Sequence, residues 1–187
     1  MNQLKDEQQI IEQAKRNPEE FAKIYNHYYS RIFNFIYKRT LNFDISRDIT
    51  SEVFLKAFIS IGTFKWRGIS IGNWLFRIAI NEINLYHRQK KYAPETLKDS
   101  YGTMVFEKHT TNLQEEKEKA EKELLDHQRF IDVSRRLKQL PQKYQDVIAL
   151  KYFEKLTIRE ISNILGIKEG TIKSLLSRGV KKLAGDN

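Results

Sequence analysis

The chain has 187 residues, of which 40% are hydrophobic and 30% are charged, and its formal net charge is +9. This composition allows one large or two small domains, and the positive charge favours an anionic partner such as nucleic acid or a membrane surface. Cysteine is absent, and no apolar run approaches the ~20 residues of a membrane span. Disulfides, thiolate metal sites and membrane insertion are therefore excluded, and a cytoplasmic location is expected.

Helical periodicity extends over roughly the first sixty residues. It predicts helices over residues 4–16, 21–39 and 43–61, with Asn17 as a cap and Pro18 at the first position of the second helix. The apolar positions of the second and third helices should form the core: Phe21, Ile24, Tyr25, Tyr28, Ile32, Phe35 and Ile36 in one, and Ile49, Val53, Phe54, Ala57 and Phe58 in the other.

The next segment combines aromatic residues with positive charge. A loop over residues 65–73 should lead into a helix over 74–91, with Leu75, Ile78, Ala79 and Ile83 facing inward, and residues 61–93 hold six Lys or Arg against one acid. Aromatic rings interleaved with cations suit single-stranded nucleic acid, because bases stack on the rings and phosphates meet the charges. A buried tryptophan pair beside a solvated basic helix explains the same pattern, and the residues alone leave both readings open.

Residues 94–112 show no periodicity, and residues 94–127 hold nine acids against five lysines. An acidic stretch between two basic segments predicts two domains joined by a tether. The second domain should begin near Glu121, continue in a helix with Phe130, Val133 and Leu137, and include another helix from Tyr144 to Phe153.

Residues 156–183 have the pattern of a helix-turn-helix. Thr157 and Glu160 form a capping box, Ile158, Ile161 and Leu165 make an apolar face, and Gly166 ends the first helix. The second helix should open near Gly170 and present a basic, hydrogen-bonding face suited to a major groove. The alternative is a plain helical hairpin with a solvated basic surface.

No catalytic constellation emerges from the sequence. The four histidines are scattered without ligand spacing, and the glycines form no phosphate-binding fingerprint. We expect a binding protein without enzymatic activity, cofactor, metal or small-molecule substrate.

Three stretches resemble a known family. DITSEVFLKAF at 48–58 and NWLFRIAINEINLYHRQKK at 73–91 resemble region 2 of bacterial RNA polymerase sigma factors, and the stretch from Leu140 to Gly179 resembles region 4. Their order and short linker, without a middle domain, identify the chain as a member of the extracytoplasmic-function (ECF) subfamily of the sigma-70 family. The resemblance implies an all-α fold with region 2 in residues 1–93, a flexible linker in 94–120 and region 4 in 121–187.

The resemblance also implies a mechanism and partners. Region 2 would bind the β′ clamp helices of core polymerase and capture the melted −10 element. Region 4 would read the −35 element as duplex and contact the β-flap. An anti-sigma factor would regulate the protein and could hold it at the membrane. The polymerase contact is expected at three residues: Asp48, Glu52 and Lys56. The −10 DNA contacts are expected at Lys65, Trp66, Arg67, Asn73, Trp74, Arg77, Asn81, Asn84, Arg88, Lys90 and Lys91. The −35 contacts are expected at Thr171, Lys173, Ser174, Ser177, Arg178, Lys181 and Lys182.

The chain departs from the family pattern at a few positions. Leu85 and Tyr86 stand where the family usually has an Asp and a basic residue, Leu175 where Arg is common, and Gly179 where Ala is common. A different class, a helix-turn-helix regulator with an N-terminal sensing domain, would instead bind specific duplex DNA without polymerase.

Overall fold

The computed structural model describes residues 6–66, 70–92 and 128–185, with only the backbone of 91 and 92, and regular structure in these ranges is entirely helical. The N-terminal elements are α1 (Glu7–Arg16), η1 (Pro18–Glu20), α2 (Phe21–Thr40), α3 (Phe43–Ser60), η2 (Ile61–Thr63) and α4 (Ile71–Tyr92). The C-terminal elements are a helix over residues 128–139, α6 (Gln142–Ile148), the π-helical turn η3 (Ala149–Phe153), α7 (Ile158–Leu165) and α8 (Glu169–Ala184). The all-α prediction is confirmed, whereas the predicted linker at 94–120 lies outside the described residues.

The N-terminal core forms where α2, α3 and α4 pack together, largely on the predicted apolar stripes. Two predicted core residues are wrong, because Tyr25 and Phe58 are 39% and 41% exposed. Both lie at the margin of the α2–α3 contact. Phe58 packs its edge against Phe21 with centroids 5.3 Å apart, and Tyr25 packs against Phe54 at 4.8 Å, so one side of each ring faces solvent.

The helix α4 begins at Ile71, earlier than the predicted start at Trp74. The cause is a buried carboxylate from α1. Glu7 Oε1 accepts hydrogen bonds from the Tyr28 hydroxyl (2.7 Å), Ser70 Oγ (3.0 Å) and the Ile71 amide (3.1 Å). A carboxylate at this position satisfies an amide that a helix N-terminus leaves without a partner and complements the helix dipole.

The C-terminal helices differ from the prediction in two details. The single helix predicted from Tyr144 to Phe153 is an α-helix that continues as a π-helical turn, where the Glu154 amide donates to the Ala149 carbonyl (3.3 Å). Leu137 is buried as expected, but Val133 is exposed.

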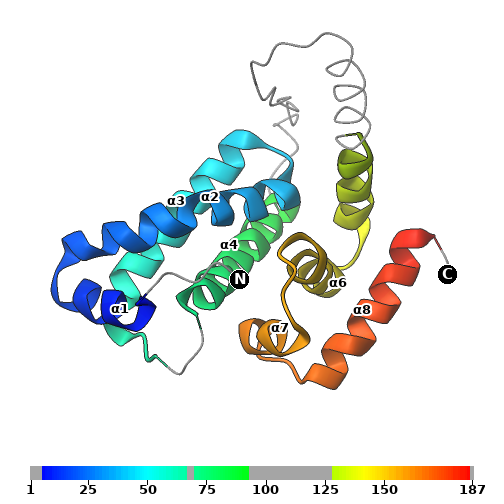
Figure 1. Ribbon diagram of the computed structural model, residues 1–187. Coiled ribbons are helices and arrows are strands. Elements are labelled where there is room, and N and C mark those ends of the chain that lie inside the picture. Colours follow the sequence, from blue (N-terminus) through cyan, green and yellow to red (C-terminus); the bar gives the residue numbers. More distant parts are fainter. Residues whose placement is uncertain (1–5, 67–69, 93–127, 186–187) are drawn as a thin grey trace, which may run out of the picture.

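The two groups of helices pack against each other. Figure 1 shows α4 between α2 and α3 on one side and α6 and α7 on the other, with α8 at the outer edge. The helix α7 contacts α4, and the turn η3 contacts α2. Consequently, α4 belongs to two interfaces, whereas the outer side of α8 faces away from the N-terminal helices.

Candidate nucleic-acid interface

The helix-turn-helix is built as the sequence predicts. Thr157 Oγ1 accepts from the Glu160 amide (3.3 Å), and the Glu160 carboxylate accepts from the Thr157 amide (2.8 Å), which completes the capping box. Gly166 ends α7 with φ of 69°, a left-handed conformation that glycine adopts without strain. Ser162 also fixes the turn, because its hydroxyl donates to the Ile167 carbonyl (2.6 Å).

All predicted −35 residues lie on the exposed side of α8. Its inner side is apolar and buried, formed by Ile172, Leu175 and Leu176. The residues of the exposed side are Thr171, Lys173, Ser174, Ser177, Arg178, Lys181 and Lys182. This surface carries four cations and three hydroxyl groups on one rigid helix.

The helix α7 has a second buried side that the sequence does not reveal. Ile161 and Ile164 are buried, while the predicted Ile158 and Leu165 are only partly so. Ile164 faces α4 and lines a small pocket of about 140 Å³ there. The helix α7 therefore packs against the N-terminal helices through Ile164, a residue outside the predicted apolar face.

The predicted −10 residues of α4 form one stripe, which we call the α4 polar face: Asn73, Arg77, Asn81, Asn84 and Arg88. Their spacing of three or four residues places them on one side of the helix. Arg77, Asn81 and Arg88 are exposed, Asn84 is half-buried and Asn73 is only 4% exposed. Asn73 is therefore present in the stripe but is not accessible in this arrangement.

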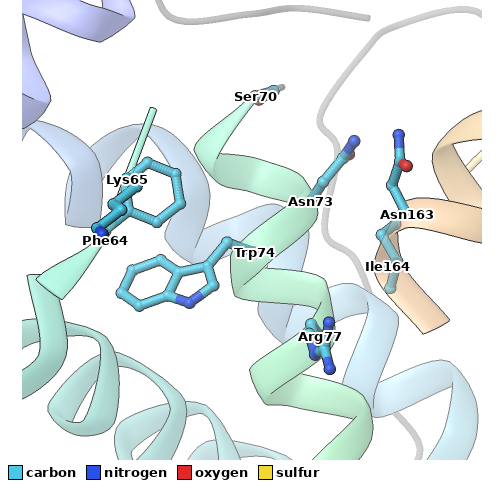
Figure 2. A pocket seen from close by; sticks show the side chains of 8 residues that line it. All are labelled: Phe64, Lys65, Ser70, Asn73, Trp74, Arg77, Asn163 and Ile164. Atoms are coloured by element: carbon cyan, nitrogen blue, oxygen red, sulfur yellow. The ribbon is translucent and has the colours of Figure 1, made fainter. Parts of the chain in front are cut away.

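The aromatic residues near the start of α4 have a packing role. The rings of Phe64 and Trp74 lie 4.9 Å apart at 47° (Figure 2), and Trp66 packs partly buried against the core. Lys65 is exposed beside them, and Lys90 is exposed near the other end of α4. Arg67 and the side chain of Lys91 lie outside the described residues.

The outer side of α3 combines charge with exposed apolar residues. Asp48 and Glu52 are exposed as predicted, but Lys56 forms an ion pair with Glu82 of α4 at 2.6 Å. Leu55 and Ile59 are 51% and 73% exposed, and sequence reasoning missed them. The sequence feature that could have revealed their exposure is their spacing of four residues on the polar side of the helix.

Comparison with known proteins identifies the family of the chain. Residues 24–92 match the family model of Sigma-70 region 2, and residues 130–183 match that of Sigma-70, region 4. The chain is 30% identical over 177 residues to the ECF RNA polymerase sigma factor SigW of Bacillus subtilis, with 92% of each protein covered. The chain belongs to the ECF RNA polymerase sigma factors.

A second relative supports the family, and two solved structures show the same fold. The ECF sigma factor BldN of Streptomyces coelicolor is 29% identical over 177 residues, which cover 94% of this chain but only 64% of BldN. The fold resembles CnrH in complex with the cytosolic domain of CnrY (TM-score 0.68, 15% identity, 96% and 95% of the two chains covered). It also resembles the sigma factor RpoE in complex with the anti-sigma factor NepR from Bartonella quintana (TM-score 0.64, 20% identity, 88% and 94% covered).

In this sigma factor, region 4 lies against the α4 polar face of region 2. Asn163 and Ile164 of α7 approach Asn73 and Arg77 of α4 (Figure 2), and all four line one pocket. Further along, Asn84 Nδ2 donates to Asp146 Oδ2 of α6 at 3.4 Å. The predicted −10 surface is therefore partly covered by the part of the chain predicted to read the −35 element.

Burial at this contact shifts two pKa values. Burial lowers the pKa of Arg39, and the neighbouring Asp146 carboxylate opposes that shift. Burial also lowers the pKa of His87 to about 4, helped by the positive charges of Arg39, Lys138 and Lys90. His87 is thus a neutral imidazole at neutral pH, surrounded by cations.

The residues that the structure describes include neither a metal cluster nor a membrane-spanning helix. Among them, no group of three or more His, Cys, Asp or Glu side chains is placed to hold a metal ion. Within the same ranges, no helix has the length and hydrophobicity to cross a membrane.

Proposed function

We propose that this sigma factor binds core RNA polymerase and directs it to promoters, reading the −35 element as duplex through α8 and the −10 element as single strand through α4. The observation that carries the proposal is the exposed side of α8, where seven residues able to meet DNA share one face above a buried apolar side. The proposal assigns residues 1–93 to region 2 and residues 121–187 to region 4. The family matches at 24–92 and 130–183 lie within these ranges.

The proposed −35 contact follows from the geometry of α8. A helix that stands on a tight turn and presents polar side chains outward fits a major groove. Lys173, Ser174, Ser177 and Arg178 lie in the first three turns, where they would meet base edges. Lys181 and Lys182 lie a turn further and suit phosphate contacts, which position a protein without specifying sequence.

The proposed −10 contact uses the α4 polar face and the aromatic residues before it. Asparagine side chains can donate to and accept from base edges, while arginine suits phosphate and base planes. Base stacking on an aromatic ring contributes about 1–3 kcal/mol. Trp66 and Trp74 are partly buried, so we assign them to the wall of a base-binding site and the exposed Lys65 and Arg77 to the phosphates.

The proposed polymerase contact is the outer side of α3. Exposed apolar residues that share one face of a helix suit a protein–protein contact, since an isolated domain gains nothing by exposing them. Leu55 and Ile59 extend the predicted contact at Asp48 and Glu52. Lys56 contributes less directly, because Glu82 already neutralises it within region 2.

Regulation by an anti-sigma factor is part of the proposal. One structural neighbour, RpoE, is described in complex with an anti-sigma factor. A protein that works with polymerase would act in the bacterial cytoplasm.

DNA binding with and without core polymerase tests the proposal. We expect weak binding to promoter duplex by the chain alone and tight, sequence-specific binding by the chain with core polymerase. Tight specific binding to duplex without polymerase would instead support a helix-turn-helix regulator with an N-terminal sensing domain.

A further inference from the structure

We infer that Glu7 of α1 is a positioning residue for the proposed −10 site: its carboxylate fixes Ser70 and the first turn of α4, from which Asn73 and Trp74 would meet the DNA strand. The inference rests on the proposed function of α4. It adds an element to that function, because α1 lies outside residues 24–92, which match region 2.

The helix α1 is packed firmly on the core of region 2. Its residues Ile11 and Ala14 are 0% and 3% exposed. The helix contacts α2 and also η2, the turn that directly precedes Phe64. Since Glu7 binds Ser70 as well, α1 contacts the chain on both sides of Lys65 and Trp66, which belong to the proposed −10 site.

The Glu7 carboxylate joins three parts of region 2 at one oxygen. Oε1 accepts from the Tyr28 hydroxyl of α2 (2.7 Å), from Ser70 Oγ (3.0 Å) and from the Ile71 amide of α4 (3.1 Å). Glu7 is only 5% exposed, so water has little access to these bonds. A buried hydrogen-bond network of this kind holds its members in one geometry.

Ser70 transmits this constraint to the first turn of α4. Its Oγ accepts from the Gly72 amide (3.1 Å), and its carbonyl accepts from the Asn73 amide (3.0 Å). Only Ser70 therefore separates Asn73 from Glu7 in this series of hydrogen bonds.

The residues held in this way line the pocket of about 140 Å³ at the start of α4. Asn73 and Trp74 share it with Phe64 and Lys65 (Figure 2). Asn73 Oδ1 is buried without a hydrogen-bond partner in the described part of the chain, and it could accept from a base edge once α7 no longer covers it. Such a group recognises a base only when neighbouring residues fix its position.

Gly72 shows how closely these parts fit together. A β-carbon on Gly72 would lie 2.8 Å from Tyr28 Cε1 and 3.2 Å from Ser70 Oγ. Both neighbours are hydrogen-bond partners of Glu7. Gly72→Ala would therefore displace the first turn of α4 from the same two groups while leaving Glu7 itself unchanged.

Tryptophan fluorescence of the full chain measures the local geometry. Trp66 and Trp74 are the two tryptophans of the protein, and both are partly buried. We expect Glu7→Ala and Gly72→Ala to shift the emission to longer wavelength as the indole rings become more solvated, with helix content by circular dichroism unchanged. Glu7→Gln keeps an acceptor oxygen and should retain the native emission.

Ser46→Ala is the control for a general loss of stability. Ser46 is completely buried in region 2, where its hydroxyl contacts Thr40 Oγ1 (2.7 Å) and donates to the Asn42 carbonyl. These bonds join the end of α2 to the start of α3. Their loss should lower the unfolding free energy without changing the tryptophan emission.

Binding of a labelled single-stranded oligonucleotide by the reconstituted holoenzyme tests the role in recognition. The oligonucleotide carries the −10 sequence obtained by mapping start sites, and its variants replace one base at a time. We expect Glu7→Ala and Gly72→Ala to reduce the preference for the native sequence by about 10-fold, which is within the contribution of one good base contact. Glu7→Gln and Ser46→Ala should keep the native preference.

Loss of preference in Glu7→Ala and Gly72→Ala, with recovery in Glu7→Gln and retention in Ser46→Ala, would support the inference. Gly72→Ala applies the same test if Glu7→Ala does not fold. Unchanged preference in the folded variants, or an equal loss in Ser46→Ala, would overturn the inference and leave the proposed function intact. If the otherwise native holoenzyme showed no preference among the oligonucleotides, the proposed −10 function would itself be rejected, together with the inference that rests on it.

Discussion

A β-carbon on Gly179 of α8 would lie 3.0 Å from Cδ1 of Ile148 in α6. It would also lie 3.2 Å from Cδ1 of Tyr144. From the sequence alone, glycine at this position is expected to destabilise the helix, by up to ~1 kcal/mol relative to alanine. The structure shows that the missing side chain lets α6 and α8 approach closely.

Gly179→Ala should therefore not stabilise the protein. The gain in helix propensity is offset by overpacking, which typically costs about 1–3 kcal/mol. Gly170→Ala is the matched control, because Gly170 also lies in α8 but has nothing within 4 Å of its β-carbon position, and it should gain up to ~1 kcal/mol. Urea unfolding measures both, and an equal gain at the two positions would contradict the packing role.

Removing the Glu7 carboxylate should destabilise the start of α4. Glu7→Ala leaves the Tyr28 hydroxyl, Ser70 Oγ and the Ile71 amide without their acceptor. Losing the acceptor for buried donors costs about 1–3 kcal/mol in unfolding free energy. Glu7→Gln keeps one acceptor oxygen and should lose less. Equal losses in chemical denaturation for both variants would show that the hydrogen bonds at this oxygen are not the cause.

Acid should weaken the fold through His87. The pKa of His87 is about 4 in the folded protein against an ordinary value of 6.5, so the unfolded chain binds more protons between these two values. Stability should fall as the pH drops from 6.5 towards 4, because burial penalises a protonated imidazole, which would also face Arg39, Lys138 and Lys90. Carboxylates titrate in part of the same window, so the comparison is with His87→Gln. Thermal melts across that window should show a shallower loss in the variant, and parallel curves would contradict the assignment.

The periodic helices and the exposed side of α8 were predictable, because burial in these elements follows the helical repeat. The start of α4 was not, since it depends on Glu7, far away in the sequence. The contact between the two regions was also missed. Arg39 and Asp146 each resemble an ordinary surface charge until α2 and α6 are brought together. Exposed Leu55 and Ile59 were not predictable as a surface, because apolar residues at helical spacing are ordinarily buried.

Within α8, base contacts and phosphate contacts should separate by mutation. Lys173→Ala or Arg178→Ala should change the preference at particular −35 positions and cost about 1–3 kcal/mol on the best sequence. Lys181→Ala or Lys182→Ala should weaken all sequences alike and reduce the salt slope by about 1. A −35 library transcribed by each variant holoenzyme measures the ranking. If Lys173→Ala and Arg178→Ala leave the ranking unchanged, base readout does not lie in these side chains.

Run-off transcription of genomic DNA with core RNA polymerase, followed by mapping of start sites, tests the central claim most directly. With this sigma factor added, we predict starts at a limited set of promoters that share −35 and −10 sequences, and their loss when the charges of Asp48 and Glu52 are reversed. Starts that do not depend on the protein, or that share no upstream sequence, would contradict its assignment as a promoter-specificity factor.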